Sequence, residues 1–377
     1  MTELEWGLPV VAKYVFGGLS MGAFVTYYLW QGFGLKTFRP LAKLAWISAA
    51  VFGLVIPIPI FSHLGQAGRW PELLLNFHWT SPMSWAAPIL VVYLVSVLLN
   101  GRFFFHDDVV LAHRSAKGVR RIALRILLLT RPPEGQLPER SRFGLRITGG
   151  LAFLSVLFFG YTGLELGILG SHPLWANPIN PAMFLITNVI SGAAFVVLLW
   201  MGLEWPRRRA ASAEEKAVLA SPILPLLIGV FLGLNLFVYL TLSYAAPAVQ
   251  DAVAVLETGA LSLIFLWVGL VLGAAVPAMM LVGNARLTVP RASVAGAAAV
   301  LILIGSFAQK YGFVAGGQIA TLAPGEVSPW PSTGQVVEFL AILALVYFLF
   351  QVALWLSPWR QMSPMPGDVS PAAEVTA

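Results

Sequence analysis

The sequence has no cysteine and only a small share of charged residues. Without cysteine the chain cannot form a disulfide, a thiolate metal site or an iron–sulfur cluster of its own. Charged residues make up 11% of the 377 residues, whereas a soluble globular protein carries about 25%. So small a share cannot cover a water-facing surface, which excludes a soluble enzyme and a nucleic-acid-binding protein.

The sequence contains long apolar segments with few charged residues, and hydrophobic residues make up 58% of the chain. A run of about 20 apolar residues crosses a hydrocarbon core of about 30 Å as a helix. These runs do not alternate polar and apolar residues as the strands of an outer-membrane barrel do. The pattern predicts nine transmembrane helices, over roughly 9–33, 41–61, 83–101, 147–170, 181–204, 220–244, 257–282, 292–312 and 334–356.

A weak internal repeat indicates how these helices group. The first predicted helix contains Gly18–Phe24 followed by Trp30, and the fifth contains Ser191–Phe195 followed by Trp200. Small residues at such spacing let helices approach closely. We therefore expect an all-α polytopic membrane protein with two four-helix bundles, helices 1–4 and 5–8, and one extra helix.

The basic residues predict the orientation of the chain, because positive charge is retained on the cytoplasmic side. With the N-terminus outside, the inner loops and tail, taken with Lys43, hold 20 of the 23 Lys and Arg residues. Lys13, Arg69 and Lys310 are the three on the other side. We expect a multi-pass protein of a bacterial or archaeal cytoplasmic membrane, with its C-terminus inside.

This orientation divides the chain into alternating membrane and cytoplasmic parts. Within the first basic loop, residues 115–130 form either an amphipathic helix on the inner leaflet or a solvated segment. The expected parts are 1–101 with helices 1–3, the cytoplasmic basic loop 102–146, 147–204 with helices 4–5, the basic loop 205–219, 220–356 with helices 6–9, and the disordered tail 357–377.

The chain has five histidines, and none is predicted near the middle of the membrane. His63, His78 and His172 lie at or beyond the outer boundary, and His106 and His113 lie in the first basic loop. A dihaem cytochrome b needs paired axial ligands on facing helices inside the bilayer. We therefore expect no haem and no iron–sulfur cluster bound by this chain, and no metal site.

Ionisable residues inside the predicted helices are costly to bury and therefore mark a candidate site. Glu165 lies in the outer third of the fourth helix, with Tyr161 one turn earlier on the same face. Glu257 begins the seventh helix and His63 ends the second, both at the outer level. We expect these four to converge, although helix-start, capping and aromatic-belt roles also account for Glu257, His63 and Tyr161.

Pro57 and Pro59 interrupt the second predicted helix near its outer end. Irregular backbone at membrane depth is tolerated where it lines a cavity or is covered by protein, which predicts a pocket beside His63. The loop that follows is aromatic and poor in charge, with Trp70 and Trp79. Such a surface indicates docking onto the membrane interface or onto a partner.

Two motifs in this region are specific enough to suggest a family. They are Ser62–Gln66 (SHLGQ) and Thr80–Trp85 (TSPMSW). They resemble the HLG-type and SPMSW-type segments of the NrfD / polysulfide reductase membrane-subunit family. Three further stretches agree with the family pattern, and the last of them carries Lys310 in the usual place of an Arg: Gly17–Phe24, Tyr161–Gly163 and Gln309–Gln318.

The resemblance implies a membrane subunit that exchanges two electrons between the quinone pool, menaquinone or ubiquinone, and an iron–sulfur subunit docked on the membrane. That partner would be of the four-cluster ferredoxin-like type. It would serve a molybdopterin, cytochrome or hydrogenase catalytic subunit. The resemblance also implies two four-helix bundles and a quinone pocket near the outer face. The Asn and His on the first helix of the polysulfide reductase branch have no counterpart here, so the pocket of that branch is not expected as a whole.

These signals together predict quinol oxidation or quinone reduction at the outer face. The resemblance assigns His63 to quinone binding and matches Tyr161 to a tyrosine of the fourth helix, and we add Glu257 to this quinone-binding set. Glu165 is the expected catalytic group, because burial raises the pKa of a carboxyl so that it can exchange a proton near neutral pH.

The partner is expected on the outer loops 62–82 and 313–333, with Trp70, Trp79 and Gln318 at the interface. Two other functions stay open. A secondary transporter also has repeats, broken helices and buried carboxyls. A structural anchor of a redox complex would have the same helices without quinone chemistry of its own.

Overall fold

The computed structural model describes residues 4–63, 66–128, 139–158, 161–204, 212–322, 327–357 and 359. The tail predicted to be disordered, 357–377, lies outside the described residues except for two positions. The described part of the chain is all-helical, as the sequence predicted.

Nine helical segments in this part of the chain are long and apolar enough to cross a membrane, and each coincides with a predicted one. Their bounds are Leu8–Gln31, Lys36–Ser62, Ser84–Phe104, Arg142–Gly167, Asn180–Glu204, Ala213–Ser243, Gly259–Ala285, Ala292–Ile319 and Thr333–Leu356.

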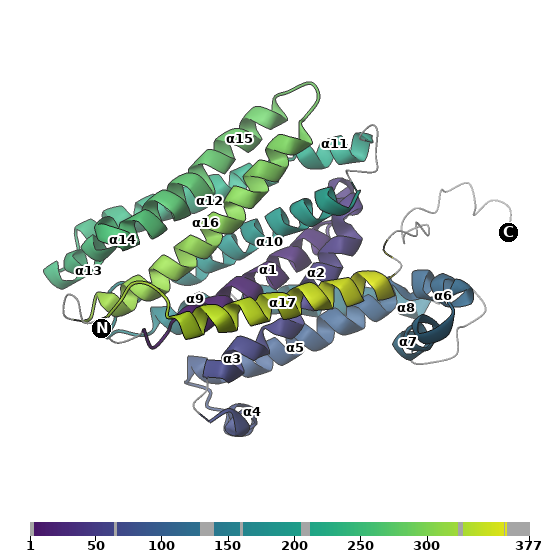
Figure 1. Ribbon diagram of the computed structural model, residues 1–377, viewed down its shortest axis with the longest axis horizontal. Helices are drawn as coiled ribbons and strands as arrows, with labels where there is room; N and C mark the ends of the chain where they lie inside the picture. Colours follow the sequence, from purple (N-terminus) through teal and green to yellow (C-terminus); the bar gives the residue numbers. More distant parts are fainter. Residues whose placement is uncertain are drawn as a thin grey trace.

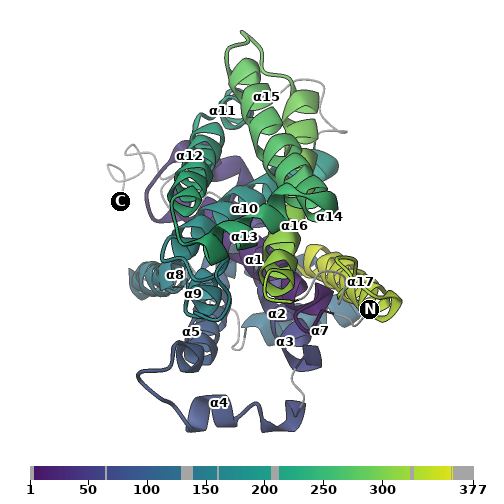
Figure 2. The same ribbon diagram turned by 90° about the vertical axis from the view of Figure 1, so that its left-hand side faces the viewer.

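The helices form two bundles that lie side by side, as Figure 1 and Figure 2 show. The first bundle contains α1 (Leu8–Gln31), α2 (Ala42–Val55) with α3 (Pro57–His63), α5 (Pro82–Phe104), and α8 (Glu139–Phe158) with α9 (Tyr161–Gly167). The second contains α10 (Asn180–Glu204), α12 (Ile223–Ser243), η4 (Leu263–Ala275) with α15 (Val276–Ala285), and α16 (Ala292–Ile319). The last helix, α17 (Thr333–Leu356), packs against α2 and α1. This arrangement confirms two four-helix bundles with one extra helix.

Shorter helices distinguish the two ends of the molecule (Figure 1). We call the end where α1 begins the N-terminal face, and the other end the opposite face. The N-terminal face carries η2 (Ala67–Arg69), α4 (Glu72–Leu75), α13 (Pro247–Glu257) and α14 (Gly259–Ser262). The opposite face carries η1 (Lys36–Leu41), α6 (His106–Ser115), α7 (Gly118–Leu128) and α11 (Ala213–Leu219).

The bundles meet where α1 crosses α10. A Cβ added to Gly22 would overlap the carbonyl oxygen of Asn188 and lie 2.9 Å from the Cα of Gly192. The second bundle contains a similar crossing, in which Gly273 of η4 faces Gly305 of α16. The small residues of the predicted repeat therefore let the backbones of α1 and α10 touch.

Two local departures from regular α-helix shape the walls of the bundles. Because Pro57 has no N–H to donate to the preceding turn, α2 ends at Val55 and α3 begins at Pro57. In η4 the turns are wider, and the N–H of Val276 donates to the carbonyl of Val271, five residues earlier. Such π-helical turns are common at functional sites.

One helix is longer than predicted. The eighth was expected to end near residue 312, but α16 continues to Ile319. Large side chains of other helices and loops occupy the space beside its glycines: Leu256 lies against Gly316, and the indole of Trp175 lies against Gly317. The residues after Gly312 therefore belong to the bundle and not to an outer loop.

The first basic loop contains a helix within the expected range. In α7, Val119, Ile122 and Ile126 are exposed on the same side as Arg121 and Arg125. An exposed face of apolar and basic side chains suits a helix at the surface of an inner leaflet. Its position on a membrane stays a prediction.

Because α1 and α10 touch where they cross, a single methyl group added there should have a large effect on stability. We expect Gly22→Ala to lower the free energy of unfolding by about 1–3 kcal/mol, because the added Cβ separates two touching backbones. Thermal unfolding of the purified protein in mild detergent measures this change. Gly233→Ala is the matched control, since nothing lies within 4 Å of a Cβ at Gly233. Equal melting temperatures for the two variants would contradict the assignment of this contact.

Candidate functional site

Three side chains meet at the end of the first bundle near the N-terminal face. Lys13 and Tyr14 belong to the second turn of α1, and Glu165 belongs to α9. The Nζ of Lys13 lies 2.7 Å from Oε2 of Glu165, and the Tyr14 hydroxyl donates to the same oxygen at 3.2 Å. The side chain of Glu165 is 6% exposed and that of Lys13 is 22% exposed. The buried carboxylate thus has the charged partner that its burial requires.

A cavity of about 400 Å³ opens beside this ion pair. Lys13, Glu165 and Asn188 of α10 supply polar groups to its lining. Most of its other walls are apolar and come from α1, α3 and α5, including Val10, Met21, Ile60, Phe61, Leu90 and Leu94. Ile56 and Pro57 also line it, so the cavity lies at the break between α2 and α3, where the sequence predicted a pocket.

A second buried amine lies between the two bundles. Lys310 of α16 is 3% exposed. Its Nζ donates to the backbone carbonyl of Tyr14 at 3.1 Å and to Oδ1 of Asn188 at 2.9 Å. Gly18 makes room for these groups, because a Cβ there would overlap both the Asn188 amide and the Lys310 amine. Hydrogen bonds offset part of the cost of removing the cation from water.

Tyr14 connects the two buried amines. Its hydroxyl donates to Glu165, whereas its backbone carbonyl accepts from Lys310. Asn188 has a similar position, since it lines the first cavity and binds Lys310. A substitution of Lys13 or Lys310 therefore alters the contacts of the same short stretch of α1.

His63 and Tyr161 lie on the elements that surround the first cavity. His63 is the last residue of α3, and Tyr161 is the first residue of α9, one turn before Glu165. Both helices contribute to the cavity wall. The side chains of His63 and Tyr161 lie outside the described residues, so their expected contacts with a ligand stay predictions.

Glu257 does not join Glu165 in one cluster, as the sequence had suggested. It ends α13 and lines a second cavity, of about 500 Å³, inside the second bundle. The predicted grouping of helices 1–4 and 5–8 already assigned the two carboxyls to different bundles, and the structure shows that each lines a cavity of its own bundle. Any role of Glu257 in ligand binding therefore concerns this second cavity.

Gln318 also lies elsewhere than expected. It is buried in α16, and its amide exchanges two hydrogen bonds with the backbone of Trp6, each 2.9 Å long. Trp6 in turn stacks on Trp175 at 5.3 Å between ring centroids. This side chain secures the chain before α1, and a contact of Gln318 with a partner stays a prediction.

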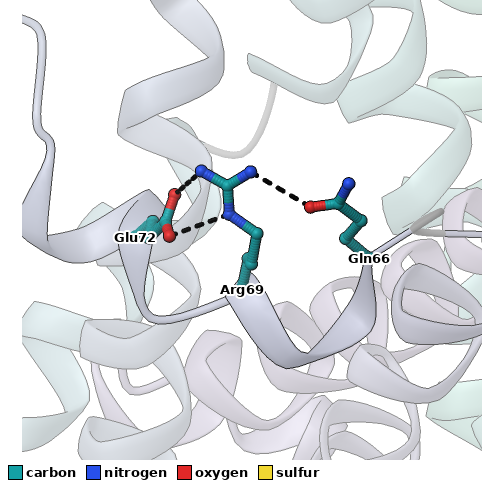
Figure 3. A network of polar contacts seen from close by, with 3 residues as sticks. All are labelled: Gln66, Arg69 and Glu72. Atoms are coloured by element: carbon teal, nitrogen blue, oxygen red, sulfur yellow. Dashed lines mark hydrogen bonds and ion pairs between the residues drawn. The ribbon is translucent and has the colours of Figure 1, made fainter.

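The loop between α3 and α5 presents exposed aromatic side chains beside the first cavity. Trp70, which also lines the cavity, is 45% exposed, and Trp79 is 76% exposed. Figure 3 shows that Arg69 binds Glu72 through two hydrogen bonds, 2.8 and 2.7 Å long, and Gln66 through one of 3.0 Å. The bonds from Arg69 hold the pKa of the Glu72 carboxyl below its ordinary value. This network ties η2 to α4.

The sequence analysis missed the binding roles of Lys13, Tyr14, Asn188 and Lys310. Both lysines lie inside apolar helices, which is a signal of a functional or structural partner. Both had been counted for the orientation of the chain, and Lys310 had also been noted in a stretch that agrees with the family pattern, but neither had been assigned a contact. Among the described residues no group of three or more His, Asp or Glu side chains is placed to hold a metal ion.

Comparison with known proteins gives a family match over most of the chain. The family model described as "Polysulphide reductase, NrfD" matches residues 1–323. That range contains every residue of the first cavity and the whole of both bundles.

Individual curated relatives share 24–27% of their aligned residues with this chain. The chain is 25% identical to a subunit of the selenate reductase of Mesobacillus selenatarsenatis over 62% of its own length, and that alignment covers 54% of the relative. It is 27% identical to protein NrfD of Escherichia coli over 62% of its length and 73% of the relative. A protein NrfD homolog of Haemophilus influenzae is 24% identical over 53% of this chain and 61% of its own length. The chain thus spans about half the length of the selenate reductase relative.

The ion pair between Lys13 and Glu165 predicts a non-additive pair of substitutions. We expect Lys13→Met to destabilise the protein by up to about 3 kcal/mol, because it leaves the Glu165 carboxylate buried without its charged partner. The double variant Lys13→Met with Glu165→Gln should recover part of that loss, since no charge then remains unpaired. Thermal unfolding of the wild type, both single variants and the double variant measures the coupling. Strictly additive losses would show that the two groups do not interact.

Proposed function

Since the chain belongs to the NrfD family, we propose that it exchanges electrons and protons between the membrane quinone pool and an iron–sulfur partner subunit. It would be the membrane subunit of an oxidoreductase complex. The chain itself would bind no haem and no cluster, and the quinone would be its substrate. The observation that carries this proposal is the apolar cavity that ends at the Lys13–Glu165 pair.

The cavity has the properties that a quinone head group requires. Its walls are apolar and come mostly from α1, α3 and α5, which belong to segments long and apolar enough to cross a membrane. Small-molecule sites are mostly apolar clefts with a few convergent polar groups. Here the polar groups come from Lys13, Glu165 and Asn188. Both quinone and quinol would reach the cavity from the lipid phase.

The residues around the cavity supply proton transfer in addition to binding. Oxidation of a quinol to a quinone releases two electrons and two protons. The Glu165 carboxylate would accept a proton from a quinol hydroxyl, and the contact with Lys13 would hold the carboxylate in position. Lys13 is the more exposed of the two, which favours passage of the proton toward water. In quinone reduction the same groups act in the reverse order.

His63 and Tyr161 would bind the quinone oxygens, as their positions on α3 and α9 allow. The electrons would leave through a cluster of the partner seated on the loop between α3 and α5. Trp70 and Trp79 would form part of that interface. In this proposal the N-terminal face lies on the outer side of a cytoplasmic membrane, as the distribution of Lys and Arg predicts.

Electron paramagnetic resonance of the complex purified from native membranes tests the proposal. Iron–sulfur signals that appear on adding a reduced quinol analogue, and that a quinone-site inhibitor suppresses, are the expected result. Clusters that do not respond to the quinol would support a structural anchor. A chain that purifies without clusters and without a quinol response would support a transporter.

We expect Glu165→Gln to reduce quinol-linked electron transfer at least about 100-fold, the lower end of the effect of a general acid–base group. The rate of quinol oxidation by the purified complex is the measurement. Glu214→Gln on α11 is the control, because its half-exposed carboxyl pairs with Arg39 at the opposite face. A variant at Glu165 with full turnover would remove this residue from the mechanism.

The exposed tryptophan of the loop predicts where the partner binds. We expect Trp79→Ser to lower the amount of iron–sulfur subunit that copurifies with the chain by about tenfold, since aromatic anchors dominate interface energies. Tyr244→Ser is the control at the same face of the other bundle, where the side chain is 89% exposed. Quantitative immunoblotting after affinity purification compares the two. Equal recovery of the partner would move the interface away from this loop.

A further inference from the structure

The second bundle holds a cavity that the proposed reaction does not use. Its volume is about 500 Å³, against about 400 Å³ for the cavity beside Glu165. Residues of α10, α12, η4 and α16 line it, and most are apolar. Leu236 and Tyr239 of α12 line it and are 59% and 46% exposed, so the cavity reaches the outer side of the bundle, where lipid lies.

Asn180, Thr187 and Asn235 also line this cavity, and their side chains donate to backbone carbonyls. The other polar groups of the cavity lie at two places. Near the N-terminal face, Glu257 of α13 accepts a hydrogen bond from the hydroxyl of Tyr239. On α16, Gln309 and Lys310 both line the cavity, about three turns before the helix ends. Apolar side chains, such as Leu266 and Phe313, form much of the remaining wall.

The groups on α16 retain hydrogen-bonding capacity. Gln309 is 7% exposed, and its amide has no hydrogen-bond partner among the residues that the structure describes. An amine of lysine has three donors, and Lys310 gives two of them to Tyr14 and Asn188. Polar groups that line an apolar cavity and keep hydrogen-bonding capacity can bind the oxygen of a ligand.

We propose that the second cavity binds a second lipid-soluble carbonyl compound of the quinone class, with one oxygen at Gln309 and Lys310. The choice of class rests on the proposed function, but the cavity and its polar groups do not. A quinone carries oxygens on opposite sides of an apolar ring and an apolar tail. This pattern matches two polar regions separated by apolar walls and an opening toward lipid.

The alternatives fit the cavity less well. A fatty acid has one polar end and leaves the other polar region unmatched. The phosphate of an anionic phospholipid would lie near the N-terminal face, where the Glu257 carboxylate repels it. The first cavity is a separate space, because the two share no lining residue.

Photolabelling of the purified complex tests this site directly. The probe is an azido-quinone with a decyl tail, added to the complex in phosphatidylcholine nanodiscs and mapped by peptide mass spectrometry. We expect labels on both bundles, and unlabelled decylubiquinone should displace them. Leu266→Trp fills the second cavity and should lower labelling of α12 and α16 at least fivefold while leaving labels on α3 and α5. Leu90→Trp fills the first cavity and should have the opposite pattern.

A second variant keeps the proposal testable if Leu266→Trp does not fold. Gln309→Leu keeps nearly the same volume and should weaken half-saturation of the second site about fivefold, as expected for one lost hydrogen bond. No label on the second bundle, or displacement by oleate or phosphatidylglycerol but not by decylubiquinone, overturns the proposal. A label on the second bundle alone upholds it and refutes the proposed role of the first cavity.

Discussion

The arrangement of the first bundle depends on the ion pair between Lys13 and Glu165. A buried carboxylate without a partner would be too costly, so α9 must bring Glu165 to the second turn of α1. Tyr14 then lies between that pair and Lys310, with its hydroxyl bound on one side and its carbonyl on the other. The seam between the bundles is consequently specified by polar contacts as well as by the close approach of Gly22 and Gly192.

The sequence predicts most of the fold because hydropathy reports on each helix separately. All nine predicted helices overlap those of the described chain, and the prolines near Ile56 mark the break that forms the first cavity. Hydropathy does not indicate which helices pack against each other. Lys13 and Lys310 were visible as charges within apolar segments, but only three-dimensional packing joins them to Glu165 and Asn188.

The errors of the sequence analysis have a common physical origin. Glu257 and Glu165 are both near the N-terminal face, yet each lines a cavity of its own bundle. Gln318 follows a glycine-rich stretch that is typical of a loop, but in the structure this stretch is helical, and Trp175 and Leu256 fill the space beside its glycines. Both outcomes depend on packing between helices, which local pattern alone does not predict.

The separation of Lys13 and Glu165 along the chain has a consequence for biosynthesis. The two residues are 152 positions apart. At a synthesis rate of about 5–20 residues per second, roughly 8–30 s pass between them. A lysine inside an apolar helix disfavours entry into lipid until it has a partner. The ion pair therefore forms only after the fourth helix has been synthesised, and packing of the first bundle is completed at that stage.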